Sequence, residues 1–532
     1  MDSEDSNNPL PSATWTSILS PNTFFEIKYA GWWVNLTWEA ADGDRVTPQH
    51  YDGATGMYSG NTYGWGEWPQ HQHQVQGTVT HFAEDFLGGD HEFKFGVIYN
   101  HSLAGWKWGH CSNVYYYDWY GYPYYAYFMN PEEYGGITNR ISSFLDDSWS
   151  VGDRLTLNLG VRFDHTRGGY PEFDKLDENA KPTGETFPAD MDLIKWDTWS
   201  PRLGLVYQLT ADRKTIFKAS YGRYYGHMLM RDLYRSAPSK SERSWWLYNW
   251  DTEAFDIRTE LIDPIANYGF DRNMKNPYSD QFSVGLEREI FPDFSLSFTG
   301  IYKESKDFVA QQNTGAEYEV IDFYDEFGDQ TLQVYNQTNP GDNFYLTTNP
   351  GNRTNYKALI LAFRKRLSNN WQVSGSLTLT RSRRYPKGYS DKNSLINNYD
   401  VPDTYDREYQ FKISGTYIFP YGIMFSAYFA HEQGRPLNRT IPVSLDQGRR
   451  EIAAEPRGSQ RLPSQTYLDL RVEKEFKLWG NARIKFLIDV WNIFNNDYHY
   501  EIASMNAASA AYLAPRNYAL PRRAQLGVRF VF

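Results

Sequence analysis

The sequence lacks several features by which whole classes of protein are recognised. Its single cysteine, Cys111, rules out an internal disulfide framework. No run of about 18 apolar residues occurs, which excludes a transmembrane helix. Basic residues are in the minority, since 53 Lys and Arg face 65 Asp and Glu, and the net charge is −12. No nucleic-acid partner is therefore expected, because phosphate binding needs basic patches.

Motifs of catalysis and export are missing as well. The sequence has no His-Glu-x-x-His, no Gly-x-Ser-x-Gly and no phosphate-binding glycine loop, so neither an enzyme nor a cofactor is expected. His71 and His73 share a predicted strand face, but they have no third ligand of fixed geometry. They are interpreted as lumen or strand-mouth residues, and no metal site is predicted. The first five residues carry no signal segment, so we expect that it was removed or that the chain is a fragment.

What the sequence has instead is strand periodicity, which is clearest in the last nine residues. Leu526, Val528, Phe530 and Phe532 are apolar, while the residues between them, Val531 apart, are polar or small. A period of two with one apolar face and a terminal aromatic residue is typical of a barrel wall with lipid outside and water or protein inside. The segment is also similar to the C-terminal assembly signal of bacterial outer-membrane barrels.

The same alternation predicts about sixteen strands paired as hairpins, the first clear one beginning at Phe24. We expect an all-β fold, a transmembrane antiparallel up-and-down β-barrel. It should occupy residues 22–532, after a polar N-terminal segment of residues 1–21. An aromatic content of 17% fits the aromatic girdles of such barrels. The mean hydropathy of −0.66 also fits, because lumen residues and polar loops dilute the lipid-facing ones.

The connections between the predicted strands alternate in length. Short turns built from Pro, Gly, Asn and Asp lie at residues 291–293, 368–370 and 420–422. Long connections such as residues 226–278 and 305–355 lie between them. Loops of this length are unusual in a compact soluble domain, whereas outer-membrane barrels have short periplasmic turns and long extracellular loops. We therefore expect the chain in the outer membrane of a diderm (Gram-negative) bacterium, in contact with its lipid.

Charged residues between apolar neighbours of these strands are predicted to face the lumen, because a strand alternates its side chains between two faces. In a porin they would set ion selectivity, and in a plugged barrel they would contact the plug. The predicted lumen-facing residues are Arg162, Asp164, Arg364, Arg366, Asp469, Arg471, Glu473, Asp489 and Arg529.

Aromatic residues crowd the predicted extracellular loops. Such rings supply a large contact area and keep a polar handle, so they predict a mouth that binds a sugar chain, a peptide or an aromatic-bearing chelate. Packing between loops, together with an outer girdle, is the alternative interpretation. The predicted ligand-binding residues are Tyr63, Trp65, Trp68, Trp106, Trp108, Tyr116, Trp119, Tyr122, Trp245, Trp246, Tyr248 and Trp250.

Several segments resemble, in their order along the chain, the hairpins of TonB-dependent outer-membrane receptors. Residues 142–149 with 155–164 are similar to the DxW…LxLNxGxRxD hairpin of that family. Residues 467–474 with 492–495 are similar to its penultimate hairpin and NLFN stop. The segments that look closer to the Oar-like subgroup are residues 91–99, 276–281 and 433–436.

The resemblance implies a 22-stranded barrel around an N-terminal plug domain. It also implies uptake of a scarce ligand, energised by the TonB–ExbB–ExbD system acting on the plug, and insertion by the barrel assembly machinery. With no room for a plug before Phe24, the chain is expected to be the last sixteen or so strands of such a receptor, its plug lying outside this chain.

Alternatives to energised uptake stay open at this point. The chain could be a self-contained sixteen-stranded porin-like diffusion channel, or an Oar-like receptor involved in protein export. For the ligand, an oligosaccharide or peptide is favoured over a siderophore, because no basic cluster is present for an anionic iron chelate.

Overall fold

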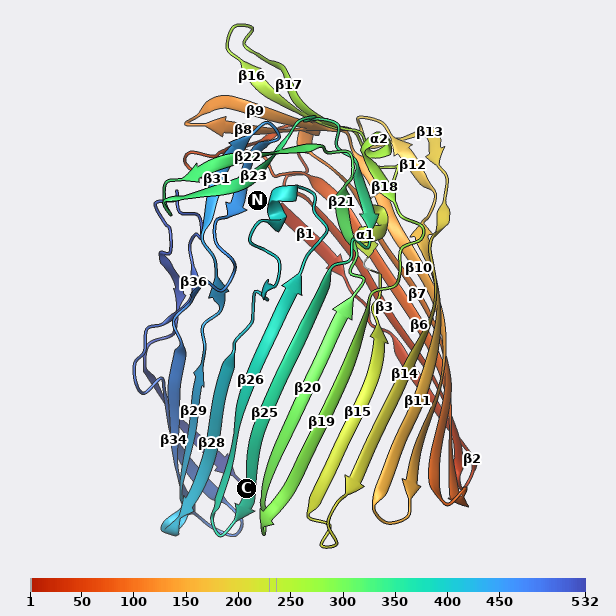
Figure 1. Cartoon of the computed structure of the whole chain (residues 1–532), viewed down its shortest axis with the longest axis vertical. Helices are drawn as coiled ribbons and strands as arrows, with labels where there is room; N and C mark the ends of the chain where they lie inside the picture. Colours follow the sequence, from red (N-terminus) through yellow and green to blue (C-terminus); the bar gives the residue numbers. More distant parts are fainter. Residues whose placement is uncertain (1, 229, 236) are drawn as a thin grey trace.

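The computed structural model describes residues 2–228, 230–235 and 237–532, and its main feature is one sheet of 19 strands (Figure 1). Apart from β1, β2 and the short β27, its strands pair antiparallel with their neighbours in chain order. This confirms the predicted all-β, up-and-down architecture. The wall strands are β3 (Thr23–Ala40), β6 (Trp65–Phe86), β7 (Gly89–Gly109), β10 (Glu132–Val151), β11 (Leu155–Tyr170), β14 (Asp190–Gln208), β15 (Thr215–Tyr225), β19 (Tyr278–Phe291), β20 (Phe294–Lys306), β25 (Arg353–Ser368), β26 (Trp371–Tyr385), β28 (Tyr409–Phe419), β29 (Ile423–Glu432), β34 (Gln465–Lys477), β35 (Arg483–Trp491) and β38 (Arg523–Val531).

Short turns lie at one end of the wall and long connections at the other (Figure 1). Asn369 and Asn370 join β25 to β26 with φ of 52° and 65°. Positive φ at both central residues is the geometry of a two-residue hairpin turn, and Asn tolerates it well. The long connections include residues 41–64, 226–277 and 307–352. The predicted alternation of short and long connections therefore corresponds to the two ends of the barrel, with the short turns at one end and the long connections at the other.

The outer face of the wall carries an apolar belt. Leu203, Val284 and Phe298 belong to it and are 50%, 52% and 48% exposed, which fits contact with lipid. The opposite face is the inner one. On it, Arg140 contacts His227 of the connection 226–277, whose short helix α1 lies in the upper end of the barrel (Figure 1).

The N-terminal segment differs from the prediction. β1 (Asp2–Asn7) pairs with the second half of β3, and β2 (Ser12–Ser20) pairs with its first half. Residues 2–20 are therefore one wall strand, interrupted at Pro9 and Pro11, and the expected boundary at residue 21 is wrong. The prolines lack the N–H that a continuous strand needs, although their carbonyls still accept hydrogen bonds from β3.

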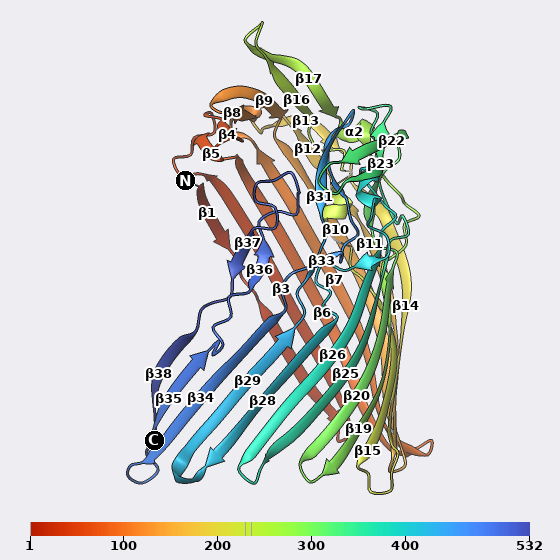
Figure 2. The same cartoon turned by 60° about the vertical axis from the view of Figure 1, so that its left-hand side comes forward.

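The wall has two free edges. Within the described residues no ladder joins β38 to β1 or β2, and each of these strands pairs on one side only. In Figure 2, β1 and β38 both lie towards the left-hand side of the molecule. Unpaired backbone groups cannot stay in contact with lipid. Both edges therefore carry backbone groups that the described residues leave unpaired.

The long connections form small sheets at the upper end of the barrel. Among the described residues no helix is long and apolar enough to cross a membrane. One apolar core, built on Val334, Ile441 and Ile452, joins β22, β23, β31 and β32. The elements of the connections are β4 (Gln49–Asp52), β5 (Met57–Gly60), η1 (Cys111–Asn113), β8 (Val114–Trp119), β9 (Tyr122–Met129), β12 (Phe173–Leu176), β13 (Pro182–Phe187), α1 (Met230–Tyr234), β16 (Arg243–Asn249), β17 (Ala254–Ile262), α2 (Pro264–Asn267), β18 (Tyr268–Phe270), β21 (Ala310–Asn313), β22 (Tyr318–Asp325), β23 (Gln330–Gln337), β24 (Tyr345–Thr348), η2 (Lys392–Leu395), β27 (Val401–Pro402), β30 (Pro436–Leu437), β31 (Thr440–Leu445), β32 (Gly448–Ala453), β33 (Gln460–Arg461), β36 (His499–Ile502) and β37 (Pro515–Tyr518), with η3 (Pro420–Gly422) at the lower end.

Candidate ligand-binding site

Three connections that are far apart in the sequence combine into one sheet at the mouth. β17, β16, β9, β8, β4 and β5 are hydrogen-bonded in that order, and β4 pairs in parallel with β8. Figure 1 shows β8 and β9 lying across the upper end of the barrel, with β16 and β17 rising above them. We call this the roof sheet. Its strands are rich in Tyr and Trp, residues that suit half-buried strands.

On one face of the roof sheet, aromatic rings converge on His110. The imidazole is 1% exposed, and its centroid lies 4.5 Å from the ring of Tyr63 and 5.2 Å from that of Trp108. Tyr127 lies at 5.4 Å and in turn contacts Trp245 at 4.7 Å. We call these five residues the ring cluster. Because Trp108 belongs to wall strand β7, the cluster attaches the roof sheet to the wall.

Burial keeps the ring cluster uncharged. The Nδ1 atom of His110 donates a hydrogen bond to the carbonyl oxygen of Tyr63 at 2.7 Å. Burial lowers the pKa of His110, and nearby Arg243 acts in the same direction, so the imidazole is neutral at pH 7. Burial also raises the pKa of Tyr127. The cluster therefore presents neutral rings and hydroxyl groups.

A buried ion pair fixes the connection 226–277 to the wall beside the ring cluster. The Glu132 side chain is 0% exposed and accepts a hydrogen bond from the Arg243 guanidinium at 2.7 Å. Its carboxylate also accepts from the indole of Trp108 at 2.9 Å and from the backbone N–H of Ser241 at 2.9 Å. A buried carboxylate needs such donors, because an unpaired buried charge is strongly destabilising.

Lys240 holds the same connection through two aromatic rings. Its ammonium nitrogen lies 4.9 Å from the ring centroid of Tyr134 on β10 and 5.8 Å from that of Tyr234 in α1. Burial, together with the smaller effect of the neighbouring Arg243, lowers the pKa of Lys240 to about 8. The ion pair and Lys240 thus position the connection without forming a catalytic arrangement.

The structure brings only part of the predicted aromatic set into the ring cluster, namely Tyr63, Trp108 and Trp245. Strand alternation places Tyr116, Trp246 and Tyr248 on the other face of the roof sheet, where Tyr116 and Tyr248 pack on Phe255. The predicted residues at the ends of the roof hairpins, all largely exposed, are Trp119, Tyr122 and Trp250.

Four of the predicted tryptophans, including Trp108 of the ring cluster, were assigned to loops, and this assignment is wrong because they lie on β6 and β7. These strands have 22 and 21 residues, about twice the length that crosses a bilayer, so their upper halves extend above the apolar belt. There neither face is lipid-facing, and the apolar alternation that marks a membrane strand is lost. The residues concerned are Trp65, Trp68, Trp106 and Trp108.

Two of these tryptophans form a row of rings on the inner wall. Trp106 stacks on Trp68, with centroids 4.8 Å apart, and meets Trp38 of β3 edge-on at 5.6 Å. Gly66 is required here, because a Cβ on it would lie 2.2 Å from the Trp38 ring. Trp65 points to the other side of β6, where Arg45 covers its buried ring at 4.5 Å.

Sequence reasoning missed a row of amides below these rings. Gln70, Gln72, Gln74 and Gln76 lie on the same face of β6 as Trp68. They are half-buried, and none of them makes a side-chain hydrogen bond to the residues described by the structure. The signal was present in the sequence, since an amide recurs at every second position of Gln-His-Gln-His-Gln-Val-Gln.

The inner faces of three neighbouring strands carry no charged side chain over long stretches. We call this surface the neutral sector. It comprises the inner-facing residues from Ala30 to Trp38 on β3, from Gly66 to Thr80 on β6 and from Gly96 to Trp108 on β7.

The histidines between the glutamines point the other way. His71 and His73 lie on the outer face of β6, above the apolar belt, so their interpretation as lumen residues is wrong. The Nδ1 atom of His73 lies 3.0 Å from the Tyr29 hydroxyl, and its Nε2 atom accepts a hydrogen bond from Trp33 at 3.2 Å. Both ring nitrogens therefore have protein partners.

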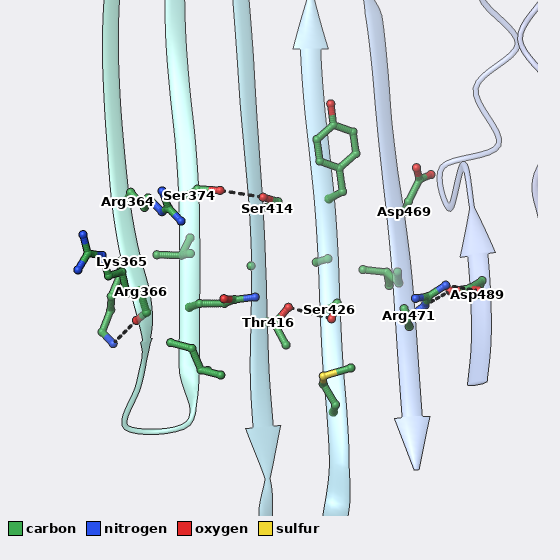
Figure 3. Close-up of a pocket in the computed structure, with 18 of the residues that line it drawn as sticks. Arg364, Lys365, Arg366, Ser374, Ser414, Thr416, Ser426, Asp469, Arg471 and Asp489 are labelled. Carbon is green, nitrogen blue, oxygen red and sulfur yellow. Dashed lines mark hydrogen bonds and ion pairs between the residues drawn. The ribbon is translucent and has the colours of Figure 1, made fainter. Parts of the chain in front are cut away.

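The opposite part of the inner wall is charged, and we call the inner face from β25 to β35 the ionic sector. It contains an open depression of about 550 Å³ (Figure 3). Arg471 donates to Asp489 at 2.8 Å, while Arg364 and Arg366 form no ion pair with any described residue. Serine and threonine pairs lie between them. The strand registers place every predicted lumen-facing residue, including Arg162, Asp164, Asp469, Glu473 and Arg529, on the inner face.

Comparison with known proteins agrees with this architecture. A family model described as an outer membrane beta barrel domain matches residues 2–434. The TonB-dependent transporter Oar of Myxococcus xanthus is 22% identical over an alignment 409 residues long, which covers 67% of this chain and 35% of that protein. The chain thus spans about a third of the length of this relative. The resemblance to TonB-dependent receptors seen in the sequence is confirmed.

Solved structures show the same fold. The outer membrane transporter YddB from Escherichia coli superposes with a TM-score of 0.56 at 14% identity, over 98% of this chain and 69% of that one. The ferric-catecholate import receptor Fiu from E. coli K12 gives a TM-score of 0.56 at 12% identity, over 99% of this chain and 64% of that one.

Proposed function

Because this chain belongs to the family of outer membrane β-barrel domains, we propose that it forms the wall of a receptor for energy-coupled uptake. The main supporting observation is the mouth, where a ring-rich roof sheet is fixed to an inner wall that carries unpaired polar groups. Flat rings with polar edges suit capture of a scarce external ligand. An oligosaccharide or a peptide is favoured over a siderophore, since the ring cluster at the mouth is uncharged and the neighbouring Arg243 is paired with Glu132.

In this proposal TonB, ExbB and ExbD act through a plug domain that this chain does not supply. The relative named as a TonB-dependent transporter supports the energy source. The inner-wall charges are then plug contacts, and Arg364 and Arg366 are free to pair with plug carboxylates. Further strands would satisfy the free edges at β38 and at β1 with β2.

Growth of the native bacterium tests the proposal. Strains lacking this gene or lacking TonB are compared on a panel of limiting carbon, nitrogen and iron sources. Loss of growth on the same nutrient in both strains is expected. A nutrient defect that is independent of TonB would contradict the proposal, as would a stable open channel formed by this chain in planar bilayers. That channel would favour the porin alternative, and accumulation of a secreted protein inside the gene-deletion strain would favour export.

Assembly is proposed to use the terminal strand. Leu526, Val528 and Phe530 lie on the outer face of β38, and Phe532 is exposed at its end. We propose that the barrel assembly machinery recognises these apolar residues of the terminal strand. A Phe532→Ser substitution should lower the amount of heat-modifiable barrel in the outer membrane, whereas Phe82→Ser on β6 should not. Equal yields for the two variants and the wild type would remove this role.

A further inference from the structure

The neutral sector differs from the rest of the inner wall in having rings and amides but no charge. Trp68 and Trp106 lie at its upper end, next to the connections that build the roof sheet. Below them, Gln70 to Gln76 extend along β6 for about 20 Å, at roughly 3.3 Å per residue. Ser102 and Asn100 of β7 lie beside this row. A ligand entering below the roof would meet the rings first and the amides next.

The arrangement of charged groups around the neutral sector disfavours both anionic and cationic ligands. An anionic ligand would need a free cation, but Lys28 at the lower limit is paired with Glu26 at 2.8 Å, and Arg140 of β10, opposite Asn100, contacts Asp164 and His227. A cationic ligand would need an anion beside the amides, but Glu132 is buried and already has three donors, and Glu4 of β1, opposite Trp38, lies beyond the upper end of the amide row. Placing an ionised ligand against uncharged groups without a counter-ion is unfavourable. The occupant should therefore be uncharged.

The hydrogen-bonding groups favour a hydroxyl-rich ligand. Each glutamine offers one acceptor oxygen and two N–H donors, which matches hydroxyl groups that both donate and accept. A strand of peptide would instead seek backbone partners at a sheet edge, and the free edges at β38 and at β1 and β2 are not part of the amide row. The indole faces of Trp68 and Trp106 can pack on the apolar face of a sugar ring.

From these observations we propose that the neutral sector is the binding track for an uncharged linear oligosaccharide. Trp68 and Trp106 are the stacking platforms, and Gln70, Gln72 and Gln74 supply the hydrogen bonds to the sugar hydroxyls. This inference rests on the proposed function, because it names the substrate class of the same receptor. The proposal also explains the amides that have no protein partner. They would discriminate against ligands that leave them without hydrogen bonds.

The test is an oligosaccharide array probed with the full chain purified in detergent. The array carries neutral chains (maltoheptaose, cellohexaose, xylohexaose, mannohexaose), acidic oligogalacturonate and alginate chains, and uncharged hexapeptides. At least one neutral chain should bind, and the variants W68A/W106A and Q72A/Q74A should each bind it about tenfold or more weakly. The matched control R364A/R366A, in the ionic sector, should bind it as the wild type does.

Three outcomes would contradict the proposed binding track. They are binding of acidic chains or peptides alone, binding of no neutral chain, and unchanged affinity in Q72A/Q74A. Heat-modifiable mobility in electrophoresis checks folding, and W68F/W106F, which keeps flat rings, should recover part of the affinity. If growth on a nutrient depends on both this gene and TonB but is unaffected by Q72A/Q74A, the track is wrong while energised uptake stands.

Discussion

The neutral and ionic sectors are two parts of one wall that differ in height as well as in chemistry. In the neutral sector β3, β6 and β7 have 18, 22 and 21 residues, whereas in the ionic sector β28, β29 and β35 have 11, 10 and 9. About ten residues cross a bilayer, so only the first group extends far beyond it. The tall part can therefore serve as an outer vestibule, while the short strands of the ionic sector stay within the thickness of the membrane.

The two parts also hold their ion pairs in different surroundings. Arg243 and Glu132 are joined where the carboxylate is fully buried, and the pair links the wall to the roof. Arg471 and Asp489 are joined on an open surface, where the Arg471 side chain is 44% exposed. A buried pair that loses one partner leaves an uncompensated charge, while an exposed pair is screened by water. The Arg243–Glu132 pair should therefore contribute more to stability than the Arg471–Asp489 pair.

The largest effect is expected from Glu132→Ala. Removal of the carboxylate leaves the Arg243 guanidinium buried without its partner, which should destabilise the mouth by about 3–5 kcal/mol. Thermal unfolding in detergent and the rate of proteolytic cleavage in residues 226–277 measure this. Glu132→Gln, which keeps one acceptor for Trp108, should lie between the wild type and Glu132→Ala. Cleavage of Glu132→Ala at the wild-type rate would show that the ion pair does not hold the connection.

Loss of a ring in the neutral sector should have the next largest effect. Trp106→Ala removes contacts to Trp68 and Trp38 and should cost about 1–3 kcal/mol in thermal unfolding, since each aromatic pair contributes about 0.5–1.5 kcal/mol. Trp199→Ala, on the exposed outer girdle, is the matched control and has one ring neighbour, Phe163. If both variants lose the same stability, the inner row is no better packed than the girdle.

Asp489→Ala should change stability by only about 0–1 kcal/mol, because the Arg471 side chain is 44% exposed and water can replace its partner. Its effect should instead be electrostatic, since it frees a third arginine on the opposite side of the depression from Arg364 and Arg366 (Figure 3). Binding of an anionic dye to the inner wall, followed by fluorescence at low and high salt, should increase at low salt alone. A loss of stability as large as that of Glu132→Ala would show that the two ion pairs contribute equally to stability.

Sequence patterns captured the membrane part of the fold because lipid imposes a strict period of two. Leu203, Val284 and Leu526 have to face hydrocarbon, so their strands and registers follow from the sequence. Above the belt this constraint ends. Trp68 and Trp106 were assigned to loops because nothing in their local pattern distinguishes a tall strand from a connection.

The site itself depends on long-range pairing that no local signal encodes. The parallel ladder between β4 and β8 and the contact of Trp245 with Tyr127 join connections that are far apart in sequence. The interrupted first strand was missed because Pro9 and Pro11 read as loop residues. The amide row could have been predicted, since glutamine recurs at every second position of this segment. Only the histidines that lie between the glutamines were interpreted.

The smallest effect concerns Lys240, whose pKa is lowered by burial to about 8. Because an unfolded lysine keeps its proton up to a pKa of about 10.4, the unfolded state binds more protons between pH 8 and 10. Packing of residues 226–277 should therefore become tighter as the pH rises through this window. Deprotonation also ends the cation–π contacts with Tyr134 and Tyr234, worth about 0.5–1 kcal/mol, so the net gain should be small. In the wild type, proteolytic cleavage of this connection should slow slightly from pH 8 to 10, after correction for the protease on a denatured control. Lys240→Met should show no such slope, and a slope of equal size in this variant would assign the titration to another group.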